Sequence, residues 1–376
     1  MLKLGDSAKF FLLFSILFFL AIPVWIENFT TLPFEGTYGS DAYYYYVQAK
    51  DSAFEGKDCS LALAPAYVCL ASTTLSLMPW FGVVGVNLLL ILIYVASIII
   101  LAKVTEKFSK IHFRYSVNSA RIKLFVYALT LNPIILWTVL RGVKETLVFL
   151  VFLLFFISMH MLLKGKIFFS LVTLLISAYV IEMLKPGGSA FVVLPYFICL
   201  FFYLYRKGGK ARLIATISAI TLSILASVIL VSYIHQLKAH QALFLGENSN
   251  VNLFVAPFRF ILGPGVIGSF RQIIFQDVFL VSTRVGDWLI FFGSVAWYLS
   301  LICLGYKLLV GFRWFKRNIT ILIMISSFFI FYIFVYSIAY GGTGDTRHRA
   351  VVYFSSIPLM AICFCIRRKR VKSFIN

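Results

Sequence analysis

The sequence contains few charged residues and few cysteines. Only 13% of its 376 residues are charged, whereas 61% are apolar and 18% are aromatic. Soluble domains use about 25% charged and about 45–50% apolar residues, so water is not the main solvent of this chain. The sequence also lacks a P-loop, a GxGxxG motif after a strand, and Ser, His and Asp residues in the order of a catalytic triad. These absences leave no basis for a large soluble catalytic domain.

The six cysteines form no C-x-x-C pair, and none has the histidine spacing of a zinc site. Only Cys59 and Cys69 are expected to form a disulfide. His235 and His240 are five residues apart, which is a poor spacing for one helix face, so we predict no metal site there.

Ten apolar runs are long enough to cross a bilayer, for which about 20 residues are needed. They predict an all-α polytopic membrane protein, with about ten transmembrane helices in one transmembrane domain over residues 1–376. The runs are 10–27, 82–103, 122–140, 146–163, 167–184, 189–205, 213–235, 286–311, 318–339 and 350–366. The first run is followed by many others and lacks a cleavage site, so we interpret it as an anchor.

The distribution of the charges behind the net charge of +20 indicates the membrane topology. If the N- and C-termini are both cytoplasmic, the inside segments hold 23 of the 34 Lys and Arg, and among the 14 acids only Asp6 and Glu106. The outside segments are then close to neutral, as the positive-inside rule requires. The basicity therefore indicates no nucleic-acid partner, and chemistry is expected on the outer face.

Two long outer segments follow from this topology. Residues 28–81 are predicted to form interfacial helices, with 61–80 as an interfacial or re-entrant piece because a full crossing there would invert every later loop. Residues 236–285 are too broken for a span and too apolar for an exposed loop. They are either a cap over the site or an amphipathic surface segment.

Three short outer stretches carry the candidate functional residues. In the first, Asp41 precedes the Tyr43–Tyr46 run, where a carboxylate is either a helix N-cap or a base. The other two are the Arg141–Glu145 stretch and the Arg347-His348-Arg349 triplet beside three glycines. Arg and Lys at helix ends either extend to lipid phosphates or bind a phosphate ligand.

These stretches resemble the GT-C superfamily of polytopic glycosyltransferases, which use sugars on polyprenyl phosphate or diphosphate. Asp41 with Tyr44 and Tyr45 is similar to that family's first motif after the first span. Pro65 matches only part of the second, since the doubled proline is missing. Glu145 stands at the outer start of the fourth span, where the family more often has Asp. The stretch from Arg347 to Pro358 resembles the basic-aromatic stretch of a late span.

The same residues also resemble bacterial O-antigen and exopolysaccharide polymerases, which share the carrier lipid. The two resemblances differ in whether one sugar or an oligosaccharide is transferred. Both imply a bacterial inner-membrane protein with its site facing the periplasm, a polyprenyl-(di)phosphate-linked donor, a glycan or lipid-linked acceptor and contact with membrane lipids. A polymerase would add a chain-length regulator as a partner.

The resemblance implies a role for each candidate. Asp41 is the expected base and Glu145 a second acid that positions the acceptor or a metal ion, with inversion at the anomeric carbon. Tyr44, Tyr45 and His348 are expected to contact substrate. No cofactor is certain, and a divalent metal such as Mg or Mn stays open. The donor phosphate is expected to bind Arg347, Arg349, Lys185, Arg141 and Lys144.

Two other classes of protein remain open. A flippase or permease for a lipid-linked sugar predicts ionisable residues along a mid-membrane path, but the runs 82–102, 146–159, 213–234 and 318–339 contain none. A structural scaffold would not require Asp41, Glu145 and Arg349 to lie near one another.

Overall fold

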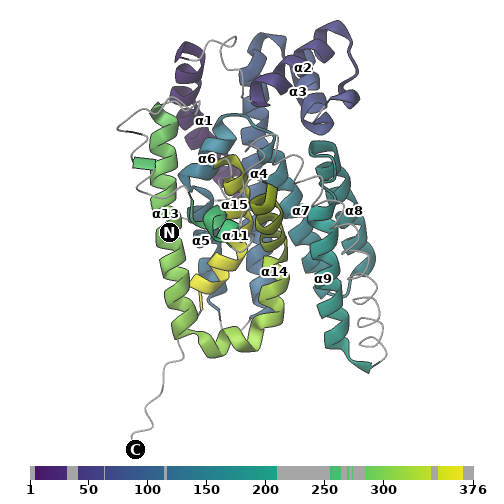
Figure 1. The fold of residues 1–376 in the computed structure, drawn as a ribbon, viewed down its shortest axis with the longest axis vertical. Helices are drawn as coiled ribbons and strands as arrows, with labels where there is room; N and C mark the ends of the chain where they lie inside the picture. Colours follow the sequence, from purple (N-terminus) through teal and green to yellow (C-terminus); the bar gives the residue numbers. More distant parts are fainter. Residues whose placement is uncertain are drawn as a thin grey trace, which may run out of the picture.

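The computed structural model describes residues 5–31, 41–62, 64–113, 117–209, 255–263, 269–270, 273, 284–339 and 346–366. Apart from one isolated bridge between Val117 and Ile366, the regular structure of these residues is helical (Figure 1). The helices run mostly along the long axis of the molecule, and the short helices α2 and α3 lie together at one end (Figure 1).

Seven helices among the described residues are long and apolar enough to cross a membrane, which makes this a multi-pass membrane protein. They are α1 (Asp6–Thr31), α4 (Gly82–His112), α7 (Glu145–Leu163), α8 (Ile167–Leu184), α9 (Ala190–Lys207), α13 (Arg284–Val310) and α14 (Phe312–Ala339). Two further helices, α5 (Ser119–Thr130) and α6 (Pro133–Leu140), form an eighth span if they are counted together.

The prediction of about ten spans is therefore only partly confirmed. The run 122–140 is bent by 58° between α5 and α6. Pro133 causes this break because it has no N–H to continue the helix, and the Asn132 side chain caps the new one by accepting from the Ile134 N–H at 2.9 Å. The run 350–366 lies in α15 (Thr346–Phe364), whose apolar part is shorter than the seven spans. The run 213–235 lies outside the described residues.

The first outer segment has the predicted non-spanning form. Helix α2 (Asp41–Glu55) is followed by a short 3-10 turn, η1 (Cys59–Leu61), and by α3 (Pro65–Leu77), which is too short to cross. A second 3-10 turn, η2 (Pro79–Phe81), leads into α4. The predicted Cys59–Cys69 disulfide is confirmed and fastens η1 to α3. Of the second outer segment, the structure describes the helix α11 (Val255–Leu262) and a few further residues.

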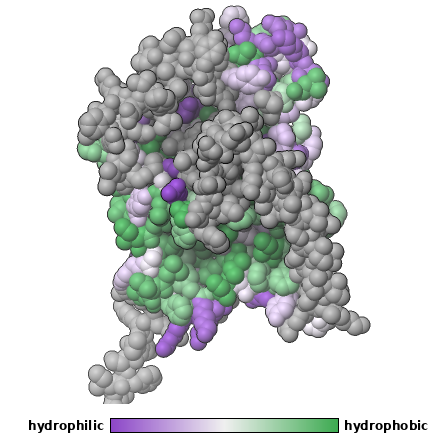
Figure 2. Space-filling view, viewed as in Figure 1, coloured by the Kyte–Doolittle hydropathy of each residue, from purple (hydrophilic) through white to green (hydrophobic). Residues whose placement is uncertain are grey.

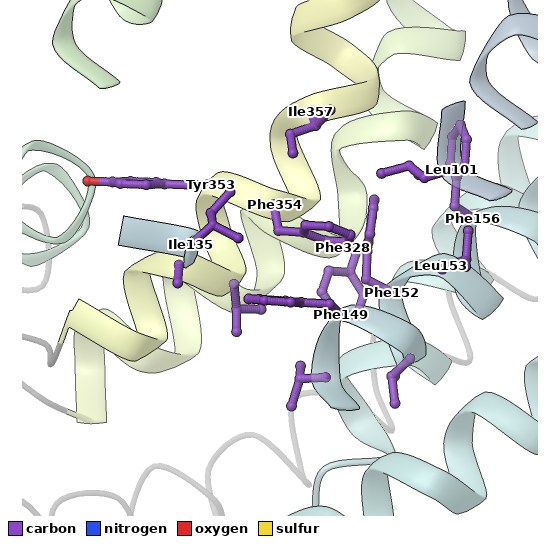
Figure 3. Packing of buried hydrophobic residues seen from close by; sticks show 14 of the residues in the cluster. Leu101, Ile135, Phe149, Phe152, Leu153, Phe156, Phe328, Tyr353, Phe354 and Ile357 are labelled. Atoms are coloured by element: carbon purple, nitrogen blue, oxygen red, sulfur yellow. The ribbon is translucent and has the colours of Figure 1, made fainter. Parts of the chain in front are cut away.

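An aromatic core holds the long helices together. Phe149 and Phe152 of α7 pack against Phe354 of α15 and Phe328 of α14 (Figure 3). The rings of Phe149 and Phe354 are stacked with centroids 4.5 Å apart, and the ring of Phe152 lies 5.3 Å from that of Phe328. Such pairs add about 0.5–1.5 kcal/mol each beyond the burial of their area. The core fixes the position of α15 relative to α7.

On the face shown in Figure 2, apolar side chains form a band across the middle of the molecule, and hydrophilic side chains gather mainly toward the two ends. Helix α8 also exposes many of its large apolar side chains, among them Phe168, Phe169, Leu175, Ile176 and Tyr179. A soluble protein would bury such a stripe, whereas a bilayer solvates it.

Helix ends that the charge pattern assigns to one side of the membrane do gather at one end of the bundle. Asp6 pairs with Lys103 at 2.7 Å, and Glu106 pairs with Lys110 and Lys123 at 2.7 and 2.8 Å. The opposite end carries α2, α3 and the beginning of α7. The pairs join the ends of α1, α4 and α5, which the charge pattern assigns to the same side.

Candidate functional site

The candidate site is built around Glu145, the first residue of α7. Its side chain is completely buried at the end of the bundle that carries α2 and α3. A buried carboxylate is costly unless cations or hydrogen-bond donors surround it, so its neighbours define the chemistry of the site.

Three parts of the chain meet at this carboxylate. Lys185, directly after α8, places its Nζ 3.4 Å from Glu145 Oε1. His348, in the first turn of α15, places its Nδ1 3.8 Å from the same oxygen. The Lys185 Nζ and His348 Nδ1 atoms are themselves 3.5 Å apart. We call Glu145, Lys185 and His348 the charged cluster.

Tyrosines of α14 enclose the charged cluster on one side. Lys185 Nζ donates a hydrogen bond to the Tyr336 hydroxyl at 2.5 Å and lies 4.8 Å from the centre of the same ring. The Tyr332 hydroxyl lies 3.5 Å from His348 Nδ1, and the two tyrosine rings stack at 4.3 Å. The Tyr336 ring also packs on the His348 ring at 4.4 Å. These contacts fix the positions of both basic groups.

A tight turn directly before α7 positions Glu145 in the site. Gly142 has φ +68°, a conformation that favours glycine, and a Cβ there would lie 1.7 Å from Asn87 Oδ1. The Tyr67 hydroxyl of α3 donates a hydrogen bond to the Gly142 carbonyl at 2.5 Å. Burial and the nearby charges of Glu145 and Tyr45 raise the pKa of Tyr67, so its hydroxyl keeps its proton and remains a donor.

Lys144 links this turn to the surface helix α2. Its Nζ donates a hydrogen bond to the Tyr45 hydroxyl and lies 4.4 Å from the centre of that ring. The Tyr45 ring packs against the Tyr67 ring at 5.8 Å. Asp41, the first residue of α2, is one helical turn before Tyr45, so the backbone brings the predicted base close to the same region.

Arg349 occupies a neighbouring buried position on α15. A Cβ on Gly263 would lie 2.6 Å from Arg349 Nη2, so the guanidinium rests directly against the end of α11. Close by, the Tyr353 ring stacks on Trp297 at 3.9 Å, and the Trp297 Nε1 donates to the Ile261 carbonyl at 2.9 Å. Helix α11, from the predicted cap segment, therefore covers the Arg349 side of the site.

The structure brings together several of the residues predicted from the sequence. Glu145, Lys185 and His348 are in direct contact, and Lys144 and Tyr45 form a second, adjoining pair. Other predicted residues lie further out. Arg141 faces the Trp137 ring, with its Cζ 5.1 Å from the ring centre, and Tyr44 is half exposed on α2. The side chains of Asp41 and Arg347 lie outside the described residues.

Four contributing residues received no role in the sequence analysis. They are Tyr332, Tyr336, Asn87 and Gly142. Tyrosines within an apolar run resemble core or lipid-facing residues, so no local signal distinguishes Tyr332 and Tyr336. Their spacing of four residues puts them on one face of α14, but only the packing of α14 against α9 and α15 shows what that face contacts.

The described part of the site is strongly cationic. Lys144, Lys185 and Arg349 are basic, His348 can add a further charge, and Glu145 is the acid among them. Such a set favours an anion over a metal cation. Within the described ranges, no three His, Cys, Asp or Glu side chains are placed to hold a metal ion. A divalent metal positioned by Glu145 stays an untested alternative.

No protein-family model, no curated protein and no solved structure matches this chain.

Proposed function

We propose that the protein is an integral-membrane glycosyltransferase. It transfers a sugar or oligosaccharide from a polyprenyl-(di)phosphate carrier to an acceptor hydroxyl at the end of the bundle that carries α2. We assign this end to the periplasmic side of a bacterial inner membrane. The observation that carries the proposal is the gathering of Lys185 and His348 around one buried carboxylate at that end, with the Lys144–Tyr45 pair beside it.

The excess of positive charge supports an anionic substrate. Basic side chains inside an apolar bundle are costly, and a bound anion would stabilise them. A lipid-linked phosphate or diphosphate is an anion at headgroup depth. In this proposal, Lys185 and Lys144 bind the phosphate oxygens, and Arg347 and Arg349 bind them from α15.

The reaction is a substitution at the anomeric carbon. The acceptor oxygen forms a bond to that carbon, and the bond from the carbon to the phosphate oxygen breaks. The (di)phosphate leaves with the electron pair, where fixed cations stabilise its growing charge. The acceptor proton goes to Asp41, whose loss should cost about 10²–10⁴ in rate.

The contacts support specific roles for three other residues. Glu145 faces Lys185 and His348, so we assign it to holding these cations in place. Tyr45 is buried and bonded to Lys144, which suits a supporting residue. The half-exposed Tyr44 is the better candidate for stacking on a sugar ring.

The test is complementation of a deletion strain, with analysis of envelope polysaccharide at matched membrane abundance. Asp41→Asn and Lys185→Met should abolish the glycan product. Asp51→Asn and Lys57→Met are matched controls on the same outer segment, where Asp51 and Lys57 pair with each other at 2.9 Å and remain partly exposed. Both controls should retain the product.

The form of the missing product identifies the reaction. Loss of one sugar indicates a single-sugar transferase, whereas loss of a ladder of chain lengths indicates the polymerase alternative. If Asp41→Asn and Lys185→Met both keep normal activity, the proposed site is wrong, and the flippase, permease or scaffold classes take its place.

A further inference from the structure

A second group of polar side chains lies inside the bundle, at the end opposite the charged cluster. Thr105, Ser109 and His112 follow one another at intervals of four and three residues, so they share one face of α4. Thr105 and Ser109 are fully buried. The Thr105 Oγ1, Ser109 Oγ and His112 Nε2 atoms are buried and have no hydrogen-bond partner within the described part of the chain.

His160 of α7 faces the same region. Its ring centre is 6.5 Å from that of His112, and the Phe108 ring lies beside both, at 4.5 Å from His112 and 5.7 Å from His160. Only 4% of His160 is exposed, and neither of its ring nitrogens has a hydrogen-bond partner among the described residues.

So many buried polar atoms in one place require an explanation. In native structures, nearly all such atoms are hydrogen-bonded, because each one left without a partner costs about 1–3 kcal/mol. The atoms come from α4 and α7, whose His112 and His160 rings are 6.5 Å apart, so a polar group bound beside these rings would satisfy several of them at once. The arrangement is therefore that of a binding site.

The surrounding charges select an anion. Lys164 and Arg206 are close enough to His112 to act on it electrostatically, and Lys107 acts in the same way on His160. The acid of this stretch of α4, Glu106, is engaged by Lys110 and Lys123. Three cations around two imidazoles repel a metal ion and attract a negative group.

We propose that His112 and His160, with Ser109, bind a phosphate group at this end of the bundle, and that Lys164 and Arg206 line the entrance. Imidazole N–H groups and a serine hydroxyl donate hydrogen bonds to phosphate oxygens, and the exposed cations attract the anion. The phosphate belongs either to an anionic lipid headgroup or to a soluble phosphate compound. This site is separate from the proposed transferase site and does not depend on it.

The first experiment titrates the full-length protein in neutral detergent micelles with inorganic phosphate, at constant ionic strength, and follows heat release. The wild type should bind saturably. His160→Phe removes both ring nitrogens at similar volume and should abolish binding without unfolding the protein, since it also removes two unpartnered buried atoms. Lys164→Ala and Arg206→Ala should each weaken binding about threefold to tenfold.

Lys110→Ala is the matched control. It removes one exposed charge from the same end of the molecule, but Lys110 pairs with Glu106 at 2.7 Å. Phosphate affinity should therefore change less than twofold. If Lys110→Ala weakens binding as much as Lys164→Ala and Arg206→Ala do, the effect is general electrostatics and the proposal is overturned.

The second experiment distinguishes the two sources of phosphate. The same titration is made in nanodiscs of phosphatidylcholine alone and in nanodiscs that also contain phosphatidylglycerol. If phosphatidylglycerol suppresses the binding of inorganic phosphate, a lipid headgroup occupies the site, whereas equal binding in both assigns the site to a soluble phosphate compound. The proposal is overturned if the wild type binds no phosphate in micelles or nanodiscs, or if folded His160→Phe binds like the wild type.

Discussion

The contact between Glu145 and Lys185 gives the sharpest test of the charged cluster. Glu145→Gln keeps the shape of the side chain but leaves Lys185 and His348 facing a neutral amide. Removing one partner of a buried ion pair typically costs about 3–5 kcal/mol. Here the Nζ–Oε1 distance is 3.4 Å and Lys185 keeps 13% side-chain exposure. We therefore expect a cost near the lower limit, about 3 kcal/mol.

A double-mutant cycle separates this pair from its surroundings. Lys185→Met removes the charge at similar length and should cost about 2–3 kcal/mol, because the bond to Tyr336 is lost as well. The double variant Glu145→Gln with Lys185→Met leaves neither charge unpaired. It should be more stable than the sum of the two single effects predicts, by about 1.5 kcal/mol or more.

An exposed pair on the outer segment is the control for this cycle. Lys57 and Glu55 are 3.0 Å apart, with side chains 62% and 60% exposed. Their coupling should be much weaker than that of the buried pair, since water screens the charges. The measurement is the free energy of unfolding in mixed micelles. Additive effects of the Glu145 and Lys185 substitutions would refute the reasoning that the two charges stabilise each other.

Two further predictions concern the supports of the site, and both use the same unfolding assay. Gly142→Ala should lower the free energy of unfolding by about 2–5 kcal/mol, because of the unfavourable positive φ and the clash with Asn87. Adding Asn87→Ala should recover only the part of the loss that is due to the clash. If Gly142→Ala is as stable as the wild type, the geometry of the turn is wrong. Cys59→Ser should lower the free energy of unfolding by roughly 2.5–3 kcal/mol, because a short cross-link is lost. A reductant should destabilise the wild type but not this variant. Equal sensitivity of both proteins to reductant would show that the disulfide contributes nothing to stability.

Much of the architecture could be predicted from local sequence. Long apolar runs separate the helices, since backbone polar groups in lipid must be satisfied within each helix. The bias of Lys and Arg predicted which helix ends share a side, and the pairs Asp6–Lys103 and Glu106–Lys123 agree with it. The number of spans was less predictable. A proline at 133 in an otherwise continuous apolar run decides whether one span or two shorter helices form.

The sequence indicated which residues belong to the candidate site better than it indicated how these residues are arranged. Glu145, Lys185 and His348 were candidates because each lies at the predicted outer end of a helix. Charged residues are rare in such a chain and mark the membrane interfaces. Which of them touch could not be deduced, since 203 positions separate Glu145 from His348 in the numbering. The tyrosines 332 and 336 gave no signal at all, as their sequence context is that of an ordinary apolar helix.

The sequence by itself determined that the chain is a helical membrane protein and that Cys59 and Cys69 pair. These properties follow from composition and from short-range spacing, because the lipid solvent and the geometry of the helix determine which local structure such a pattern forms. Only the tertiary structure decided that Glu145 meets Lys185 and His348, and that His112 meets His160 at the other end. Contacts between distant helices depend on how aromatic side chains pack between α7, α14 and α15, and that packing is a property of the whole bundle.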